Sequence, residues 1–422
     1  MPENETVPLA IIGAGAAGCF AAAEAGTENG DGIYLFEGGA KPLQKVRISG
    51  GGRCNVTHAC FDPKQLTENY PRGFRELRGP FTRFQPGDTI EWFGARGVEL
   101  KKEEDGRMFP TTDQSQTIID CLLQTLQKRE VSLLKNQRIL SLRRDETGHF
   151  LLERKAAPPI RAKFLLLAVG SLAASPLRSS LEALGHTLTE TVPSLFTFCI
   201  EDPALQALAG LSLPEAKVTV PGFPKSQTGP ILITHWGLSG PAVLKMSAWA
   251  ARYLHQKDYH FSCEVQWVSE KPEALREKFK AHRSSQAKRQ VQSACPVSIP
   301  RRLWTYLCTK AGTGDTTWAQ LPTKTANTLI ELLTRQTFSV TGKSTFKEEF
   351  VTCGGISLKE VNFRTMESRH CSNLFFAGEC LDIDGVTGGF NFQAAWTTGY
   401  LAGQTLQERL KAEAVDSNEQ ST

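Results

Sequence analysis

The stretch Leu9-Ala10-Ile11-Ile12-Gly13-Ala14-Gly15-Ala16-Ala17-Gly18 joins a short apolar run to a Gly-x-Gly-x-x-Gly turn. The apolar run predicts a buried parallel strand, and the Ala-rich residues after it predict a helix. In such a turn the first glycine permits the tight bend, the second lets a diphosphate approach the backbone, and the third lets the helix pack on the strand. A second predicted strand ends at Glu37, where an acid can hold ribose hydroxyls. These features predict a βαβ unit that binds a dinucleotide.

A second strand, turn and helix near the carboxyl end of the chain favour FAD over NAD. Phe375-Phe376-Ala377-Gly378-Glu379 predicts a strand followed by an acid that can hold a ribityl chain, and a Gly-rich turn, Gly385–Gly389, precedes a helix from about Phe392. The N-terminus of that helix can stabilise the negative charge that flavin N1 and the C2 carbonyl gain on reduction. No second Gly-x-Gly-x-x-Gly follows a strand, so NAD(P)H is expected only as a transient electron donor.

A third element, Lys45-Val46-Arg47-Ile48-Ser49-Gly50-Gly51-Gly52-Arg53-Cys54-Asn55, carries three successive glycines. Glycines in this number predict backbone that wraps closely around a ligand. Arg53 is expected to pair with a phosphate, and Asn55 to hold a ring edge. The alternative is a flexible surface loop without a ligand.

The pattern changes along the chain and predicts two insertions. Asp113 and Gln116 predict a capping box at the start of a helix, whereas short strand-like pieces between Pro and Gly follow Thr191. We therefore predict an α/β fold, in which a discontinuous Rossmann-like FAD-binding domain carries an inserted antiparallel β-barrel and a small helical domain. The predicted boundaries are 1–190 plus 352–412 for the FAD-binding domain, 191–270 plus 336–351 for the barrel, 271–335 for the helical insert and 413–422 for a polar tail.

Composition excludes several classes of function. The 422 residues carry a net charge of +4, and the sequence has no apolar run of about 18 residues, so no membrane span is expected. The first residues lack a basic region before an apolar one, so no secretory signal is predicted and the cytoplasm is the expected location. The 11 cysteines include no Cys-x-x-Cys, and no Cys/His cluster has zinc spacing, so neither a dithiol reductase nor a metal site is predicted.

Four runs of residues resemble one protein family: Lys45–Asn55, Thr234–Ala242, Met366–Ser368 and Phe376–Gly385. It is the NAD(P)/FAD-dependent oxidoreductase family that includes aminoacetone oxidases and the bile-acid 3-dehydro-4,6-reductase type. The resemblance extends from about Leu9 to Gly403. It implies a Rossmann-like FAD domain, an inserted β-barrel and a small helical domain, in agreement with the boundaries predicted above.

The resemblance also implies which residues line the FAD. One stretch departs from it, because Ala168–Pro176 lacks the Thr-Gly-Gly and Tyr-Pro steps of the relatives, so no relative's substrate is carried over to this chain. The predicted FAD-binding residues are Gly13, Ala14, Gly15, Ala16, Ala17, Gly18, Glu37, Gly38, Lys45, Ser49, Gly50, Gly51, Gly52, Arg53, Cys54, Asn55, Ala168, Val169, Gly170, Gly378, Glu379, Asp384, Gly388, Gly389, Phe390 and Asn391.

Two residues are candidates for acid–base chemistry. His235 follows an apolar strand and precedes a Gly-Leu-Ser-Gly turn, where an imidazole could face the flavin or simply fix the turn. Cys54 follows the glycine run and could protonate a substrate carbon, although a buried structural thiol is the favoured alternative.

Basic residues gather in the predicted helical insert, and this bears on partners. They could attract RNA, or they could form an ordinary solvated helix face. Reduction of uracil in ribosomal RNA has been associated with the family that the chain resembles. Three hypotheses stay open: a small-molecule reductase or amine oxidase that moves a hydride at flavin N5 with NAD(P)H as external donor, an RNA-modifying enzyme that reduces uridine to dihydrouridine, and a non-catalytic flavin-binding protein. The basic residues are Arg276, Lys278, Lys280, Arg283, Lys288, Arg289, Arg301 and Arg302.

Overall fold

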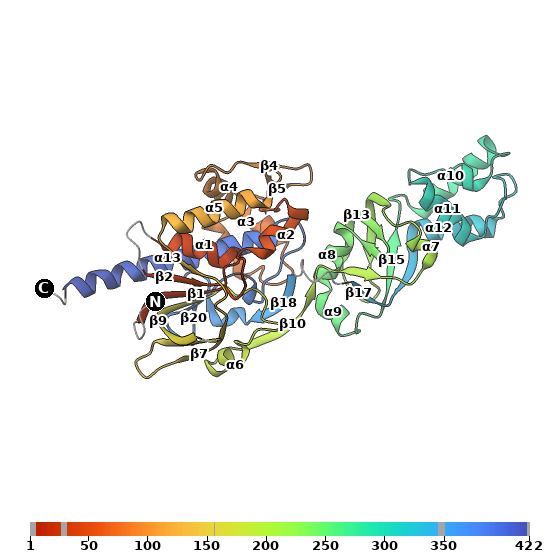
Figure 1. Ribbon diagram of the computed structural model, residues 1–422. Coiled ribbons are helices and arrows are strands. Elements are labelled where there is room, and N and C mark those ends of the chain that lie inside the picture. Colours follow the sequence, from red (N-terminus) through yellow and green to blue (C-terminus); the bar gives the residue numbers. More distant parts are fainter. Residues whose placement is uncertain (1–5, 27–31, 156, 345–350, 420–422) are drawn as a thin grey trace. The chain divides into compact units, whose positions relative to one another are not determined.

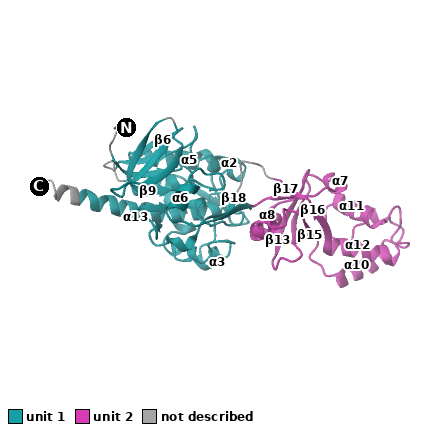
Figure 2. Cartoon of the chain, turned by 90° about the horizontal axis from the view of Figure 1, so that it is seen from below, with its two compact units in different colours: residues 1–193, 347–422 teal, residues 194–346 magenta. Residues whose placement is uncertain are grey.

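The computed structural model describes residues 6–26, 32–155, 157–344 and 351–419. Residues 1–193 with 347–422 form one compact unit, called unit 1, and residues 194–346 form unit 2 (Figure 2). Unit 1 is therefore discontinuous in sequence, and unit 2 is inserted into it.

The large sheet of unit 1 is parallel at its centre (Figure 1). Its strands are β1 (Thr6–Ile12), β2 (Ile33–Phe36), β6 (Ser132–Leu134), β7 (Ile139–Arg144), β8 (Phe150–Arg154), β9 (Ala157–Leu167), β19 (Val361–Asn362), β20 (Glu367–Ser368) and β21 (Leu374–Phe376). Within the described residues the order is β19-β20-β21-β9-β1-β2-β6, and β8 joins β7 to β9. β21, β9, β1, β2 and β6 pair in parallel, which places the carboxyl ends of β1 and β21 at one edge, with β9 between them.

The helices of unit 1 are α1 (Ala16–Ala25), α2 (Gln44–Gly52), α3 (Pro63–Thr67), α4 (Pro86–Gly94), α5 (Ser115–Lys128), α6 (Arg178–Ala183) and α13 (Phe390–Glu419). α1 and α13 approach closely because glycines of α13 face the backbone of α1. A Cβ added to Gly399 would lie 2.7 Å from the carbonyl oxygen of Ala17, and one added to Gly403 would lie 2.6 Å from that of Ala21. The spacing Gly399-x-x-x-Gly403 thus forms one face of α13.

Two smaller sheets complete unit 1. The first contains β3 (Thr57–His58), β4 (Leu100–Lys102) and β5 (Arg107–Pro110), in the order β3-β5-β4. The second pairs β10 (Leu188–Ser194) with β18 (Val351–Ile356). A Cβ on Gly354 would lie 2.1 Å from the carbonyl oxygen of Glu190, so the two strands touch there.

Unit 2 contains an antiparallel sheet of β11 (Thr197–Cys199), β12 (Ser212–Thr219), β13 (Ser226–Thr234), β14 (Gly237–Ser239), β15 (Phe261–Gln266), β16 (Gln336–Val340) and β17 (Gly342–Ser344). Its order is β16-β15-β12-β13-β14-β11-β17. The expected α/β class and antiparallel insert are confirmed, but among the described residues no ring of hydrogen bonds closes the sheet into a barrel. The two end strands are instead consecutive in the chain, because only Thr341 separates β16 from β17 and its N–H donates to the carbonyl of Cys199 (3.0 Å).

The helical part of unit 2 shares its core with this sheet. The helices are α7 (Pro203–Gln206), α8 (Pro241–Trp249), α9 (Ala251–His255), α10 (Pro272–Ser285), α11 (Arg301–Ala311) and α12 (Thr323–Arg335). One cluster of buried side chains runs from sheet residues such as Phe338 to helix residues such as Trp304. The indole of Trp267 donates to Gln336 (2.7 Å), whose side chain donates to Tyr306 of α11 (2.9 Å).

Two local predictions differ from the structure. Asp113 does not cap a helix: it has a φ of +53°, α5 begins at Ser115, and the Asp113 carboxylate pairs with Lys101 instead. The predicted polar tail from residue 413 continues α13 as far as Glu419. No helix within the described ranges is both long and apolar enough to cross a membrane.

Candidate functional site

The Gly13–Gly18 turn lies at the carboxyl end of β1 and leads into α1. A Cβ on Gly13, whose φ is +103°, would lie 2.3 Å from the carbonyl oxygen of Ala168 at the end of β9. A Cβ on Gly18 would lie 1.9 Å from the carbonyl oxygen of Gly13. A Cβ on Gly15, by contrast, would meet no atom within 4 Å. The turn is therefore tightly packed on its protein side and open at Gly15, before the first N–H groups of α1.

Glu37 follows β2 and anchors this turn. Its carboxylate accepts hydrogen bonds from the N–H of Ala14 (3.2 Å) and of Gly39 (2.7 Å). The intervening Gly38 is exposed. The acid predicted to bind ribose is thus next to the glycine turn, at the adjoining strand end.

The glycine run of α2 is a left-handed bend. The φ angles of Gly50, Gly51 and Gly52 are +59°, +68° and +83°, and the N–H of Cys54 donates to the carbonyl of Ser49 (3.0 Å). Nothing lies within 4 Å of a Cβ on Gly51 or Gly52, so this backbone presents an open surface.

The N-terminus of α13 is fixed to the segment after this bend. The Asn55 amide, oriented to satisfy both partners, donates to the carbonyl of Thr57 (3.0 Å) and accepts from the N–H of Gly389 (2.9 Å). A Cβ on Gly389 would lie 2.5 Å from the carbonyl oxygen of Thr57. Asn391 exchanges two 2.8 Å hydrogen bonds with the backbone of Gly385, so the turn before the helix is closed on itself.

Glu379 joins three segments of unit 1. Its carboxylate pairs with Lys45 of α2 and accepts from the N–H of Thr352 in β18 (3.0 Å). A Cβ on Gly170 would lie 3.8 Å from this carboxylate, and Val169 and Gly170 follow the end of β9 at Leu167. Gly378 packs against α1, because its Cβ would lie 2.7 Å from that of Ala17.

These residues fit an FAD. The open Gly15 backbone and the start of α1 suit a diphosphate, since helix N-termini favour anions. Glu37 at the next strand end suits ribose hydroxyls, and the start of α13 offers N–H groups to the pyrimidine end of a flavin. Residues 7–405 match the model of the HI0933-like protein Rossmann domain family.

The chain belongs to the HI0933-like family. This HI0933-like protein is 31% identical over 408 residues to the ribosomal RNA dihydrouridine synthase of Escherichia coli (strain K12), covering 94% of the chain and 97% of the relative. It is 27% identical over 412 residues to the 3-dehydro-bile acid delta(4,6)-reductase of Clostridium scindens, covering 95% and 99%. The crystal structure of 3-ketosteroid delta1-dehydrogenase from Sterolibacterium denitrificans shares the fold, with a TM-score of 0.50 at 10% identity over 96% of this chain and 100% of that chain.

Family membership confirms two predictions from the sequence. The HI0933-like protein is an FAD-dependent oxidoreductase, and FAD is its cofactor. The expected resemblance to the bile-acid reductase type is confirmed as well.

Two side chains predicted to contact FAD are bound elsewhere. Arg53 donates to Glu103 (2.6 Å) and its guanidinium lies 4.0 Å from the centroid of the Phe109 ring, and hydrogen bonding to Glu103 raises its pKa. Asp384 is fully buried and pairs with Arg72 through both carboxylate oxygens. The Arg53 guanidinium thus contacts Glu103 and Phe109, and the Asp384 carboxylate contacts Arg72.

The two catalytic candidates lie in different surroundings. Cys54 has a φ of +61° and is completely buried, and burial raises the pKa of its thiol to about 12. Such a thiol stays protonated and shielded, which favours the structural alternative. His235 lies in unit 2, exposed in the two-residue turn between β13 and β14, and Trp236 beside it is 56% exposed. The turn is fixed because the carbonyl of Trp236 accepts from the N–H of Ile200 (2.8 Å).

Three side chains near the α13 N-terminus were missed from the sequence. The hydroxyl of Tyr70 donates to the carbonyl of Phe390 (2.6 Å), and Arg72 binds Asp384. His58 stacks on the Phe390 ring at 4.7 Å between centroids. The position of His58 shortly after Asn55 was the only sign in the sequence that it lies near the site. These partners of His58, Tyr70 and Arg72 lie more than 300 residues further along the chain.

Most of the basic side chains of unit 2 have local partners. Arg276 pairs with Glu273 and Lys278 with Glu270, while Arg283, Arg289 and Arg302 donate to backbone carbonyls. A shallow groove of about 430 Å³ lies between α7 and α11, lined by Ala204, Ala207, Leu208, Arg301, Arg302, Thr305, Tyr306 and Thr309.

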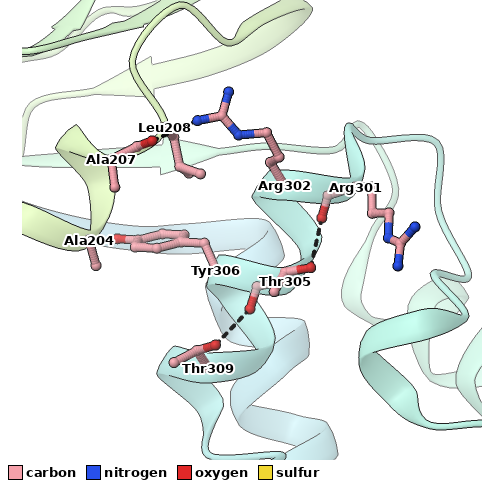
Figure 3. A pocket seen from close by; sticks show the side chains of 8 residues that line it. All are labelled: Ala204, Ala207, Leu208, Arg301, Arg302, Thr305, Tyr306 and Thr309. Carbon is pink, nitrogen blue, oxygen red and sulfur yellow. Dashed lines mark hydrogen bonds between the residues drawn. The ribbon is translucent and has the colours of Figure 1, made fainter.

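The polar groups of this groove are largely satisfied by the protein. Figure 3 shows Arg302 reaching toward Ala207, whose carbonyl it binds at 2.6 Å, while Arg301 points away from the groove. The hydroxyls of Thr305 and Thr309 donate to backbone carbonyls one turn earlier in α11. Among the described residues, no group of three or more His, Cys, Asp or Glu side chains could hold a metal ion.

Proposed function

We propose that the protein reduces a carbon–carbon double bond conjugated to a carbonyl group in a small molecule. The observation that carries this proposal is the α13 N-terminus, fixed by Asn55 and Asn391 beside the glycine turns. Its N–H groups would stabilise negative charge at flavin N1 and the C2 carbonyl, which favours a reduced flavin able to give up a hydride from N5. An amine-bearing substrate, oxidised by hydride transfer in the opposite direction, is the other outcome that the same site allows.

The names of two relatives support this substrate class. Dihydrouridine is a uridine whose ring double bond, conjugated to a carbonyl, has been reduced. A delta(4,6)-reductase of a 3-dehydro-bile acid acts on ring double bonds near a ketone. Reduction of a conjugated carbonyl compound is the chemistry that these names share, and it requires one hydride and one proton.

We propose NAD(P)H as the external source of the hydride. The chain has one Gly-x-Gly-x-x-Gly turn, and we assign this turn to the diphosphate of FAD. No second turn of this kind is left for a nicotinamide dinucleotide. The nicotinamide would therefore bind transiently, deliver its hydride to the flavin and leave before the substrate enters.

An anaerobic titration tests both steps. The FAD-loaded protein is mixed with NADH or NADPH, and loss of the oxidised flavin absorbance is expected with at least one of them. Subsequent addition of 2-cyclohexen-1-one, as a simple enone, should restore the absorbance, whereas benzylamine added to the oxidised protein in place of the nicotinamide should not bleach it. Persistent oxidised flavin with both nicotinamides would refute the donor, and absence of reoxidation by 2-cyclohexen-1-one would refute the substrate class.

His235 is the residue we propose as proton donor to the substrate. It is an exposed imidazole on a fixed turn, and imidazoles exchange protons near neutral pH. In H235Q, flavin reduction by NAD(P)H should keep its wild-type rate while reoxidation by the enone slows by about 100-fold or more. Equal reoxidation rates would remove His235 from the mechanism.

Ribosomal RNA is a second candidate substrate, favoured by the names of the relatives from Escherichia coli and Haemophilus influenzae, both ribosomal RNA dihydrouridine synthases. The basic segment of unit 2 would supply the electrostatic attraction. Because several of its cations pair locally, the residues best placed to contact phosphates are Lys280, Lys288 and Arg301, for which no such partner is found in the described part of unit 2.

A salt titration of RNA binding separates the two substrates. Neutralising Lys280, Lys288 and Arg301 to Gln should reduce the slope of log affinity against log salt by about 0.7–0.9 for each phosphate that the variant no longer neutralises. The control neutralises Arg276 and Lys278, which already pair with acids, and should change the slope less for each charge removed. If the wild-type protein, the triple variant and the control show equal slopes and the enone is still turned over, RNA is ruled out and the small molecule remains as the substrate.

A further inference from the structure

Trp236 differs from every other tryptophan of the chain. Five of the seven tryptophans donate their indole N–H to another residue of the protein: Trp92, Trp267, Trp304, Trp318 and Trp396. The ring of Trp249 is covered by Lys225, whose Nζ lies 3.2 Å from the ring centroid. The Trp236 indole has no hydrogen bond, ring contact or cation contact with any described part of the chain, and the residue is 56% exposed. It therefore leaves a large apolar surface in water, which is unfavourable unless a ligand covers it.

The backbone that carries this indole is held by the sheet. The N–H of Trp236 donates to the hydroxyl of Thr234 (3.2 Å), and its carbonyl accepts from the N–H of Ile200 (2.8 Å). A Cβ on the next residue, Gly237, whose φ is +139°, would lie 2.3 Å from the carbonyl oxygen of Phe198. The indole thus projects from a turn that is already ordered, so little conformational entropy of the backbone is lost when a ligand binds there.

Further apolar surface lies on the same hairpin. Leu232 of β13 is 38% exposed, and within the described residues of unit 2 Leu232 and Trp236 are the large hydrophobic side chains that are exposed. His235, the neighbour of Trp236 in the turn, is exposed as well. Exposed apolar surface that gathers at one place is a feature of binding sites. Here it occurs beside an imidazole.

We propose that Trp236 binds the substrate by stacking its indole on a planar ring that contains the conjugated carbonyl group. The proposal rests on the function above, in which His235 gives a proton to the substrate and Trp236 is the adjoining residue. Aromatic side chains stack on flat π systems with little dependence on the substituents of the ring. A cyclic enone and a uracil ring both present such a conjugated face, so this chemistry covers a free small molecule and a nucleotide.

Ligand binding to the oxidised, FAD-loaded protein tests the proposal. Oxidised flavin has no hydride to give, so the ring is not consumed during the measurement. Dissociation constants of 2-cyclohexen-1-one and of uridine are determined by ligand-observed NMR titration. For a ring that binds the wild-type protein, W236A should raise the Kd about tenfold, as expected for the loss of one stacked aromatic side chain, and W236F should raise it less. The control L140A truncates an exposed apolar side chain of β7 and should keep the wild-type Kd.

The two probes also distinguish the source of the ring. An effect of W236A on the enone alone assigns the ring to a free small molecule, and an effect on uridine alone assigns it to a nucleotide. Equal Kd values in the wild-type protein and W236A overturn the proposal. Equal increases in W236A and W236F also overturn it, because an aromatic face would then not be what binds, and so does a wild-type protein that binds neither probe. Failure of the proposed function looks different: the enone would bind in a manner that depends on Trp236, yet would not reoxidise the reduced flavin.

Discussion

The guanidinium of Arg72 binds both carboxylate oxygens of Asp384, whose side chain is fully buried; Nε lies 2.5 Å from Oδ1. Replacing Arg72 by Met would leave a buried carboxylate without its cation. We expect the free energy of unfolding of R72M to fall by about 3–5 kcal/mol, because uncompensated buried charge is costly. Urea unfolding followed by tryptophan fluorescence measures the change.

Two further variants give this prediction its contrast. The double variant R72M/D384L removes both charges and should recover much of the stability. R335M breaks the exposed pair with Glu331, in which both side chains are 63% exposed, and should change stability by no more than about 0.5 kcal/mol. Equal destabilisation in R72M and R335M would show that burial of the Arg72–Asp384 pair does not affect the free energy of unfolding.

Two glycines of the first turn should respond differently to alanine. G13A forces a Cβ to 2.3 Å from the Ala168 oxygen at a φ of +103°, so the protein without FAD should become less stable. G15A meets no protein atom within 4 Å and should fold normally, but its methyl group would occupy the space at which a diphosphate approaches the backbone. Thermal unfolding without FAD and equilibrium dialysis with FAD distinguish the two effects. Normal FAD affinity in G15A would contradict the placement of the diphosphate.

The close approach of α1 and α13 predicts that two Gly→Ala substitutions in helices change the free energy of unfolding in opposite directions. G403A would place a methyl group 2.6 Å from the Ala21 oxygen and should destabilise the protein by about 1–3 kcal/mol. G94A, at an exposed position of α4 with no neighbour within 4 Å, should stabilise it by about 0.5–1 kcal/mol. Chemical denaturation of both proteins provides the test, and stabilisation by G403A would be incompatible with the described helix contact.

His186 predicts a pH dependence of stability. Burial lowers the pKa of this imidazole below its ordinary value, although Glu360 opposes the shift. The unfolded chain therefore binds a proton that the folded protein resists. The free energy of unfolding should be unaffected by this group above the unfolded pKa of about 6.5, and should fall as pH drops from there through the folded pKa.

The matched variants are H186Q and H149Q. Unfolding by urea between pH 8 and 5 should show a shallower decline of stability in H186Q, which also lacks the hydrogen bond between the imidazole Nε2 and the Ser368 hydroxyl (2.8 Å). H149Q should follow the wild-type curve. An unchanged slope in H186Q would mean that other groups carry the acid sensitivity.

The parts of the fold that follow local rules could be predicted from the sequence. β1, the Gly13–Gly18 turn and α1 are adjacent in the chain, and each glycine has a role that its spacing reveals. The same holds for β21 and the turn before α13. The discontinuous arrangement was predicted from the change of pattern along the chain, and the family resemblance agreed with it.

Pairings between distant segments could not be predicted. Asp113 has the residue type of a helix cap, yet Lys101 and Arg53 hold its carboxylate, and only the folded β4–β5 region brings them together. Arg53 was expected at a phosphate because it follows three glycines, and nothing in the sequence indicated its ion pair with Glu103, which comes 50 residues later. The Arg72–Asp384 pair joins residues more than 300 positions apart, and no spacing rule indicates it.

The pairing of β10 with β18 has a consequence for how such proteins change. The chain leaves unit 1 after β10 and re-enters it at β18, so unit 2 is inserted between two paired strands. Unit 2 could therefore be replaced or altered by mutation while the segments of unit 1 that carry the glycine turns keep their sequence.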